Sequence, residues 1–166
     1  MDCGQRSAQL RAYSHQFMPK FRNNCTAGAC FFCVLCTVEP IWDELRKQWV
    51  RDTPEERVRQ QVIAWLLERG IPASAIGIEK KVSVYGRLKR FDLLVFRGGL
   101  PWLVVECKAP NVRLNQKVYD QVFSYRHALN CPLALATNGV QWILFRHRPD
   151  LPAGMEALQE LPTFAP

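Results

Sequence analysis

Residues 91–108 have the sequence FDLLVFRGGLPWLVVECK, in which two apolar runs flank a Gly98-Gly99 turn. Two strand-like runs joined by so short a loop are expected to pair as antiparallel neighbours. A loop of Gly98-Gly99-Leu100 places Arg97 opposite Pro101 and fixes the register of the remaining pairs. Both runs are almost continuously apolar, which predicts strands that are covered on both faces. The hairpin therefore predicts the centre of a sheet flanked by helices.

Two acidic residues interrupt these apolar runs. In the predicted register Asp92 lies opposite Glu106, and because side chains alternate along a strand, Lys108 shares the face of Glu106. Two carboxylates about 5 Å apart repel each other unless a cation lies between them. A hard divalent cation such as Mg²⁺ satisfies both carboxylates and keeps water ligands for chemistry. Lys108 would then orient or deprotonate the attacking water and stabilise the charge around phosphorus.

A purely structural arrangement accounts for the same residues. In that arrangement Lys108 neutralises one of the two acids and Arg90 pairs with the other, which gives an ion-pair network without a metal. The residues by themselves leave both interpretations open.

The rest of the chain is expected to supply further helices and strands. Thr53-Pro54-Glu55-Glu56 has the residues of a helix start, with Thr at the N-cap, Pro at the first position and Glu at N3. We expect a lead-in helix over 41–49, helices over 54–69 and 115–129, and strands over 78–85, 91–96, 102–108, 133–136 and 142–145. Asn138-Gly139 predicts a hairpin between the last two strands.

This order, α-β-β-β-α-β-β, predicts an α/β fold of the mixed-sheet (α+β) kind, with helices flanking a central sheet. Residues 39–148 form the predicted domain. Residues 1–38 are interpreted as a poorly patterned N-terminal extension, and the Pro-containing residues 149–166 as a loosely ordered tail.

The composition is that of a basic, core-forming protein. Apolar residues make up 48% of the 166 residues, and 22 Lys and Arg against 15 Asp and Glu give a net charge of +7. This balance suits a polyanionic partner, most simply nucleic acid. No signal peptide or bilayer-spanning run is evident, so we predict a cytoplasmic protein with reduced thiols and no membrane contact.

Most of the cysteines fall in the first 36 residues. Cys25, Cys30, Cys33 and Cys36 have spacings found in iron–sulfur and zinc sites. A disordered extension or an incorrectly chosen start explains the same residues without a metal, and the sequence leaves these interpretations open.

Several motifs occur in a fixed order between about Ile41 and Phe145. They are Thr53-Pro-Glu-Glu-Arg-Val-Arg-Gln60, Arg90-Phe-Asp92, Val104-Val-Glu-Cys-Lys-Ala-Pro110, Asp120-Gln121 through Tyr125, and Thr137-Asn-Gly139. This set resembles the PD-(D/E)xK phosphodiesterase superfamily and, more closely, the N-terminal nuclease domain of type I restriction enzyme R subunits. The resemblance implies a restriction-endonuclease-like core. One departure is that Phe91, rather than proline, precedes Asp92.

The resemblance also implies the roles of individual residues. Asp92 and Glu106 would bind Mg²⁺ (or Mn²⁺), Lys108 would serve the hydrolytic water, Glu56 would be the acid of the first helix, and Gln121 and Tyr125 would form the Gln-x-x-x-Tyr pair. The residues alone explain Glu56 as part of a capping box, and they place Gln121 at the edge of a helix face, where it contacts either the site or solvent.

The predicted activity is that of a metal-dependent DNA endonuclease of restriction-modification type, in which a Mg²⁺-activated water hydrolyses phosphodiester bonds. Residues expected to contact double-stranded DNA are Tyr125, Arg90, Lys89, Arg113 and Lys117. The alternative is a non-catalytic DNA-binding or assembly module. The chain has no Gly-x-x-x-x-Gly-Lys-Ser/Thr loop and thus no expected ATP site, so motor, specificity and methylation subunits would be separate partners.

Overall fold

A computed structural model describes residues 39–84 and 86–165 of the chain, and the predicted cysteine site lies outside them. The main sheet contains β3 (Ile76–Ile78), β6 (Leu93–Arg97), β7 (Leu100–Cys107), β8 (Leu133–Thr137), β9 (Trp142–His147) and β10 (Met155–Leu158). Its strand order is β10-β9-β8-β7-β6-β3. The β7–β8 pair is parallel and every other neighbouring pair is antiparallel. The predicted mixed α/β architecture is confirmed.

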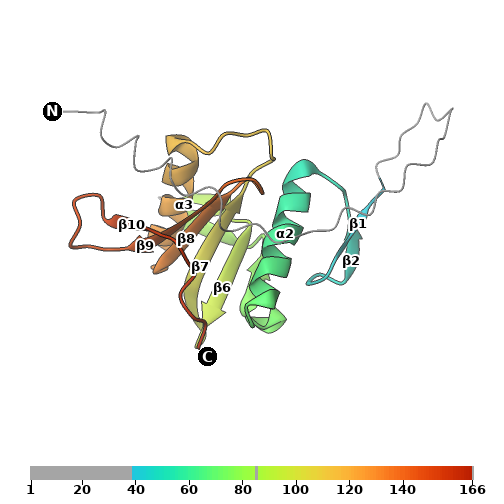
Figure 1. Cartoon of the computed structure of the whole chain (residues 1–166), viewed down its shortest axis with the longest axis horizontal. Coiled ribbons are helices and arrows are strands. Elements are labelled where there is room, and N and C mark those ends of the chain that lie inside the picture. The colour runs from blue at the N-terminus through green and yellow to red at the C-terminus, as the bar shows by residue number, and fades with distance from the viewer. Residues whose placement is uncertain (1–38, 85, 166) are drawn as a thin grey trace.

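Two helices cover this mixed sheet (Figure 1). Their bounds are α2 (Pro54–Glu68) and α3 (Gln116–Ala128), and a single 3-10 turn, η1 (Ala73–Ala75), precedes β3. Leu93 and Val95 belong to the core beneath α2, whereas Leu94 between them belongs to the core beneath α3. Full burial of one such side chain contributes about 1.5–3 kcal/mol. The expectation that these strands are covered on both faces is therefore confirmed.

The start of α2 agrees with the prediction. Thr53 is the N-cap, and its Oγ1 accepts a hydrogen bond from the backbone N–H of Glu56 at 3.1 Å. Pro54 occupies the first helical position, where no backbone N–H is needed.

The turn of the β6–β7 hairpin is one residue shorter than predicted. Arg97 pairs with Leu100 rather than with Pro101. The loop is therefore Gly98-Gly99 alone, and both glycines have positive φ, at +57° and +77°. A two-residue turn of this kind needs φ above zero at both central positions, which glycine adopts without steric cost.

A register shift between Val95 and Phe96 compensates for the shorter turn. Beyond this bulge Leu93 pairs with Val105, which is the register predicted from sequence. Asp92 immediately precedes this pair and Glu106 immediately follows it in the chain. The bulge thus restores the juxtaposition of the two acids, although the local turn prediction was wrong.

The lead-in helix predicted over 41–49 is wrong. The chain forms a separate hairpin there, with β1 (Ile41–Asp43) antiparallel to β2 (Gln48–Val50). Trp42 and Trp49 face each other across it, with ring centroids 5.5 Å apart. The Asp43 carboxylate accepts two backbone N–H groups of the turn, at 2.9 and 2.8 Å. Such a side-chain-to-backbone turn competes with helix formation, and cross-strand pairing explains the apolar spacing.

The strand predicted over 78–85 is also wrong in extent. Glu79 has a φ of +48°, which ends β3 after Ile78. The chain then forms a second small hairpin, of β4 (Lys81–Val84) and β5 (Arg87–Arg90), that is hydrogen-bonded outside the main sheet. This hairpin adds a strand that the predicted order lacked.

The C-terminal residues are held more firmly than expected. Residues 155–158 form β10, which pairs along its whole length with β9. Further on, the Phe164 ring packs against Trp102 with centroids 5.3 Å apart. A strand pair and a buried ring contact explain why this segment is not loose.

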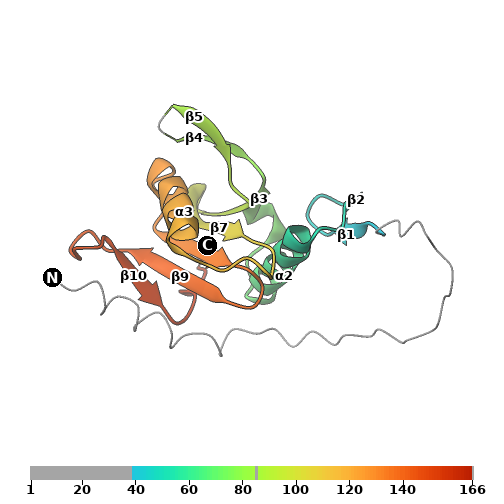
Figure 2. The ribbon, with the colours of Figure 1, turned by 90° about the horizontal axis from the view of Figure 1, so that it is seen from above.

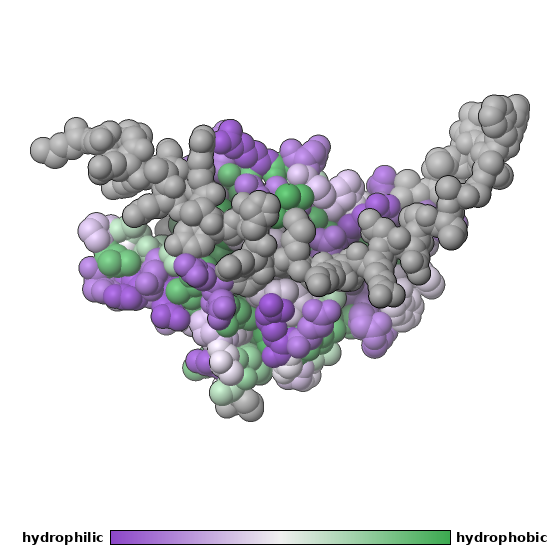
Figure 3. Space-filling model, viewed as in Figure 1, coloured by the Kyte–Doolittle hydropathy of each residue, from purple (hydrophilic) through white to green (hydrophobic). Residues whose placement is uncertain are grey.

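Hydrophilic and hydrophobic residues are mixed on the face of the molecule shown in Figure 3. The large apolar side chains instead gather in the two clusters on either side of the sheet. Neither described helix has the length and apolar character needed to cross a bilayer.

The glycine of the predicted Asn138-Gly139 hairpin gives a test of this packing. Gly139 has a φ of +82°, and an added Cβ would lie 2.9 Å from Gln61 Oε1 and 3.0 Å from a Val58 methyl group of α2. We expect Gly139→Ala to lower the free energy of unfolding by about 2–4 kcal/mol, from left-handed backbone and overpacking together. Gly70→Ala is the matched control, because φ is +77° there and no atom lies within 4 Å. Equal losses in urea denaturation would contradict the close approach of turn and helix.

Candidate active site

Glu106 is a buried acid near the end of β7, only 3% exposed. Its Oε1 accepts a hydrogen bond from Lys108 Nζ at 2.6 Å and another from Gln121 Nε2 at 2.6 Å. Its Oε2 is also buried, and it has no hydrogen-bond partner in the described part of the chain. One carboxylate oxygen therefore lacks the partner that buried polar atoms normally have.

Burial, followed by the nearby negative charge of Asp92, raises the pKa of Glu106 from 4.5 to about 7. The hydrogen bond from Lys108 opposes this shift but does not cancel it. A carboxylate in this state is stabilised by any further positive charge that reaches it.

Asp92 lies immediately before β6, where the chain bends. Its Oδ2 accepts the backbone N–H of Cys107 at 2.7 Å, and its Oδ1 accepts a hydrogen bond from Arg59 Nη2 at 2.9 Å. Cys107 is the residue that follows Glu106. The structure thus brings the two predicted acids together at one end of the β6–β7 pair.

Lys108 follows the last residue of β7. Its backbone N–H donates to the Thr137 carbonyl at 2.8 Å, which extends the parallel β7–β8 pairing. Burial opposes its charge, but the hydrogen bond to Glu106 and the surrounding carboxylates raise its pKa. Lys108 is therefore a charged donor at neutral pH. Both roles considered from sequence for Lys108, orienting a water and deprotonating one, stay predictions.

Arg59 is the residue that sequence analysis missed. Its guanidinium is buried and contacts three carboxylates, those of Glu56, Asp92 and Glu79. Burial opposes its charge, but Asp92 and the other acids together raise its pKa. A signal was present in the sequence, because position 59 has the helical phase of Val62 and the other buried residues of α2.

Glu56 turns towards this guanidinium rather than back to its cap. Its carboxylate pairs with Arg59 and accepts a hydrogen bond from Gln60 Nε2 at 2.9 Å. Thr53 caps the Glu56 N–H, so only one half of the predicted capping box forms. Arg59 links Glu56 to Asp92, and the role of Glu56 in the site stays a prediction.

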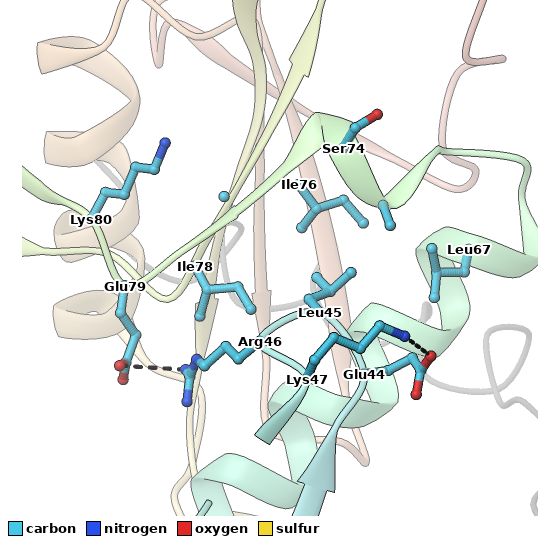
Figure 4. Close-up of a pocket in the computed structure, with 12 residues that line it drawn as sticks. Glu44, Leu45, Arg46, Lys47, Leu67, Ser74, Ile76, Ile78, Glu79 and Lys80 are labelled. Atoms are coloured by element: carbon cyan, nitrogen blue, oxygen red, sulfur yellow. Dashed lines mark hydrogen bonds and ion pairs between the residues drawn. The ribbon is translucent and has the colours of Figure 1, made fainter. Parts of the chain in front are cut away.

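Glu79 and Arg46 extend the network to the β1–β2 hairpin. Arg46 Nη2 lies 3.3 Å from Glu79 Oε2, and Figure 4 shows the two side chains pointing towards each other. They border a cleft of about 660 Å³ between this hairpin and the η1–β3 segment. Neither residue was predicted to be near the site.

The Gln-x-x-x-Tyr pair of α3 lies on the other side of Glu106. The Gln121 amide donates to Glu106 and to Tyr125 Oη, the latter at 3.2 Å, and its oxygen accepts from Lys108 at 3.3 Å. Tyr125 Oη donates to the Arg90 carbonyl at 3.1 Å. Gln121 therefore has the site partners that one of its two sequence interpretations required.

The remaining predicted DNA contacts lie further out. Arg113 and Lys117 are exposed before and within the first turn of α3, and neither makes an ion pair within residues 39–84 and 86–165. Lys89 and Arg90 belong to β5, and Arg90 Nη2 lies 3.7 Å from Glu79 Oε1.

Cations of the protein itself pair with both acids. Lys108 pairs with Glu106, and Arg59 pairs with Asp92. This is the ion-pair network considered from sequence, but Arg59 replaces Arg90 in it. The replacement follows from the fold, because α2 brings Arg59 to Asp92 whereas Arg90 is directed to Glu79.

The described acidic side chains determine which residues could bind a metal ion. No described group of three or more His, Cys, Asp or Glu side chains is arranged to hold a metal ion. The candidate donors are therefore the carboxylates of Asp92 and Glu106. Their oxygens suit a hard cation held by one or two carboxylates plus water, and the orphaned Oε2 of Glu106 would gain a partner. The chemistry of these two donors is the one that Mg²⁺ prefers.

Residues 54–162 match the protein family described as the type I restriction enzyme R protein N terminus. The chain belongs to this family. The resemblance to the N-terminal domain of restriction enzyme R subunits is thereby confirmed, and family membership indicates a function in a restriction system. The matched part of this R protein N-terminal domain begins at α2 and extends past β10, beyond the end predicted from sequence. Comparisons with curated proteins and with solved structures give no match.

The raised pKa of Glu106 predicts a pH dependence of stability for this domain. The fold favours the protonated acid, so this contribution is complete below about pH 4.5 and is lost as the pH rises through about 7. In the presence of EDTA, we compare the free energy of unfolding of Glu106→Gln with that of the parent protein. We expect this difference to shift in favour of the variant by up to about 3 kcal/mol as the pH rises from 5 to 8. Urea denaturation at each pH measures this difference, and Glu160→Gln, at an exposed position, is the control. A difference that does not change with pH would overturn the assignment.

Arg59 gives a second stability test. Arg59→Met leaves three carboxylates around a buried position without their shared cation, and we expect a loss of about 3–5 kcal/mol in the free energy of unfolding. Arg57→Met on the same helix is the control, because the Arg57 side chain is 66% exposed whereas that of Arg59 is 8% exposed. We expect a much smaller change there. Similar denaturation midpoints for both variants would show that Arg59 is not a structural centre.

Proposed function

We propose that this R protein N-terminal domain is a Mg²⁺-dependent endonuclease that hydrolyses phosphodiester bonds of double-stranded DNA in a restriction-modification system. The observation that carries the proposal is the juxtaposition of Asp92 and Glu106 beside Lys108 at one end of the β6–β7 pair. Mn²⁺ has the same preference for oxygen ligands and is expected to substitute for Mg²⁺.

The roles of the residues follow from their contacts. When bound, Mg²⁺ would supply a hard positive charge that activates water and neutralises the phosphate. Asp92 and Glu106 would hold it, the latter through Oε2. Lys108 would donate a hydrogen bond to the phosphate or to the attacking water. Gln121 bonds both Glu106 and Lys108 and so would fix their relative positions.

The proposal includes a restriction-endonuclease-like fold of the PD-(D/E)xK kind. The support for it is the order of the central elements. An antiparallel β6–β7 pair brings the two acids together, α3 follows it and contributes Gln121, and the chain returns in β8 parallel to β7. α2 packs on the opposite face and directs Glu56 and Arg59 towards Asp92.

A non-catalytic DNA-binding or assembly module is the second candidate. The observation that favours it is the pairing of each acid with a protein cation, Arg59 or Lys108, which neutralises the pair without a metal. Under this proposal the domain keeps its basic surface and binds DNA in a salt-dependent way but does not cleave it.

The proposed partners are duplex DNA and the motor, specificity and methylation subunits of a restriction system. Family membership supports a role with other subunits and with DNA. The expected lack of an ATP site in this chain and the expected cytoplasmic location stay predictions.

Plasmid nicking with Mg²⁺ tests the catalytic proposal. We expect Asp92→Asn, Glu106→Gln and Lys108→Ala each to reduce the cleavage rate at least about 100-fold, because each removes a charge used in the transition state. Glu160→Gln removes an exposed carboxylate elsewhere and is expected to cleave like the parent protein. Calorimetric titration with Mn²⁺ gives a second readout, in which the Asp92 and Glu106 variants lose binding.

The outcomes separate the two candidates. Equal cleavage by the parent protein and by all three site variants would remove the catalytic assignment. Absence of cleavage by the parent, together with salt-sensitive DNA binding, would favour the binding module.

A further inference from the structure

The β4–β5 hairpin projects from the body of the domain, beyond α3 (Figure 2). Residues 80–90 contain five cations and no acid, namely Lys80, Lys81, Arg87, Lys89 and Arg90. Of these, Lys81, Arg87 and Lys89 make no ion pair within the part of the chain that the structure describes. Like charges on one small ribbon repel each other, so the hairpin presents a positive surface that a polyanion would stabilise.

The two faces of this hairpin differ. Residues paired across an antiparallel ribbon share a face, and Val84, paired with Arg87, is buried in the core beneath α3. On the opposite face Ser83 is paired with Leu88, and both are exposed. Leu88, near the start of β5, is 73% exposed. The face of Val84 thus anchors the hairpin, and Arg87 and Lys89 share that face because they pair with Val84 and Val82. The opposite face, which carries Lys81, Leu88 and Arg90, is open to a partner.

Both ends of the hairpin are fixed at the candidate active site. The backbone N–H of Glu79 donates to the Asp92 carbonyl at 2.9 Å, which brings together the residues before β4 and after β5. Tyr125 Oη of α3 donates to the Arg90 carbonyl at 3.1 Å. A polyanion held along the hairpin would therefore lie next to the two carboxylates.

We propose that the β4–β5 hairpin is the arm with which this domain grips double-stranded DNA. Leu88 enters a groove, and the unpaired cations contact phosphates from both faces of the ribbon, Lys81 from the face of Leu88, and Arg87 and Lys89 from the other. A two-stranded ribbon has the width that the major groove of B-DNA admits, and an exposed apolar side chain contacts base edges there. The proposal rests on the proposed function only for the identity of the ligand, and it requires binding but no cleavage.

Removal of the unpaired cations tests the phosphate contacts. Binding of a 30-base-pair duplex is measured in EDTA over a salt series, for the parent protein and for K81Q/R87Q/K89Q. The salt slope is expected to fall by roughly 3, with an affinity loss of at least about tenfold near 0.1 M salt. The control, K47Q/R51Q/R97Q, has the same change in charge on other exposed positions, and its slope is expected to change by less than about 1.

A photocrosslinker tests the position of Leu88. Leu88 and Leu100 are both exposed hairpin residues, 73% and 72% respectively, so p-benzoylphenylalanine at either position is equally accessible. We expect crosslinks to the duplex from position 88 and none from position 100. Crosslinks from both positions, or from position 100 alone, would overturn the proposal.

These measurements are independent of catalysis. A domain that binds through the hairpin but never nicks DNA would retain this proposal and lose the nuclease assignment. A parent protein that fails to bind the duplex at low salt, or equal losses for the two triple variants, would overturn the role of the hairpin even if nicking is observed.

Discussion

The buried guanidinium of Arg59 lies between three carboxylates. Each of these acids comes from a different part of the chain. Glu56 belongs to α2, Glu79 follows β3, and Asp92 immediately precedes β6. Buried like charges are tolerated only when an opposite charge is close and well hydrogen-bonded. The guanidinium donates through Nη1 and Nη2, although its buried Nε has no hydrogen-bond partner among the described residues. It thereby ties α2 to the end of the β6–β7 pair where the acids gather.

Glu106 has a different set of contacts, on the side of the site that faces α3. Lys108 and Gln121 both donate to one of its oxygens, while the second oxygen is buried without a partner. The pKa of Glu106 is raised because burial and the negative charge of Asp92 outweigh the hydrogen bond from Lys108, which lowers it. An incompletely satisfied carboxylate beside a second acid is a costly arrangement for stability alone, and it is typical of a site that binds a cation.

The positions of the basic residues connect this site with the rest of the surface. The β4–β5 hairpin is inserted between Glu79 and Asp92, so that its charged strands begin and end at the acidic network. A substrate bound by the hairpin would not need to be moved far to reach the carboxylates. Membership of the family of type I restriction enzyme R protein N termini indicates a function in a restriction system.

The sequence by itself determined both helices and the β6–β7 and β8–β9 hairpins. These features depend on local information, namely apolar periodicity, an N-cap threonine and glycine turns. The sequence also predicted Asp92 beside Glu106, but the bulge between Val95 and Phe96 that restores this register was not predicted. Tertiary structure decided the β1–β2 and β4–β5 hairpins, the pairing of β10 and the central role of Arg59. The role of Arg59 depends on a residue 33 positions away, Asp92, because the partner of a buried arginine is set by packing and charge rather than by its neighbours in sequence. The three strand pairs are local in sequence, but whether such short segments form strands depends on how their side chains pack in the fold.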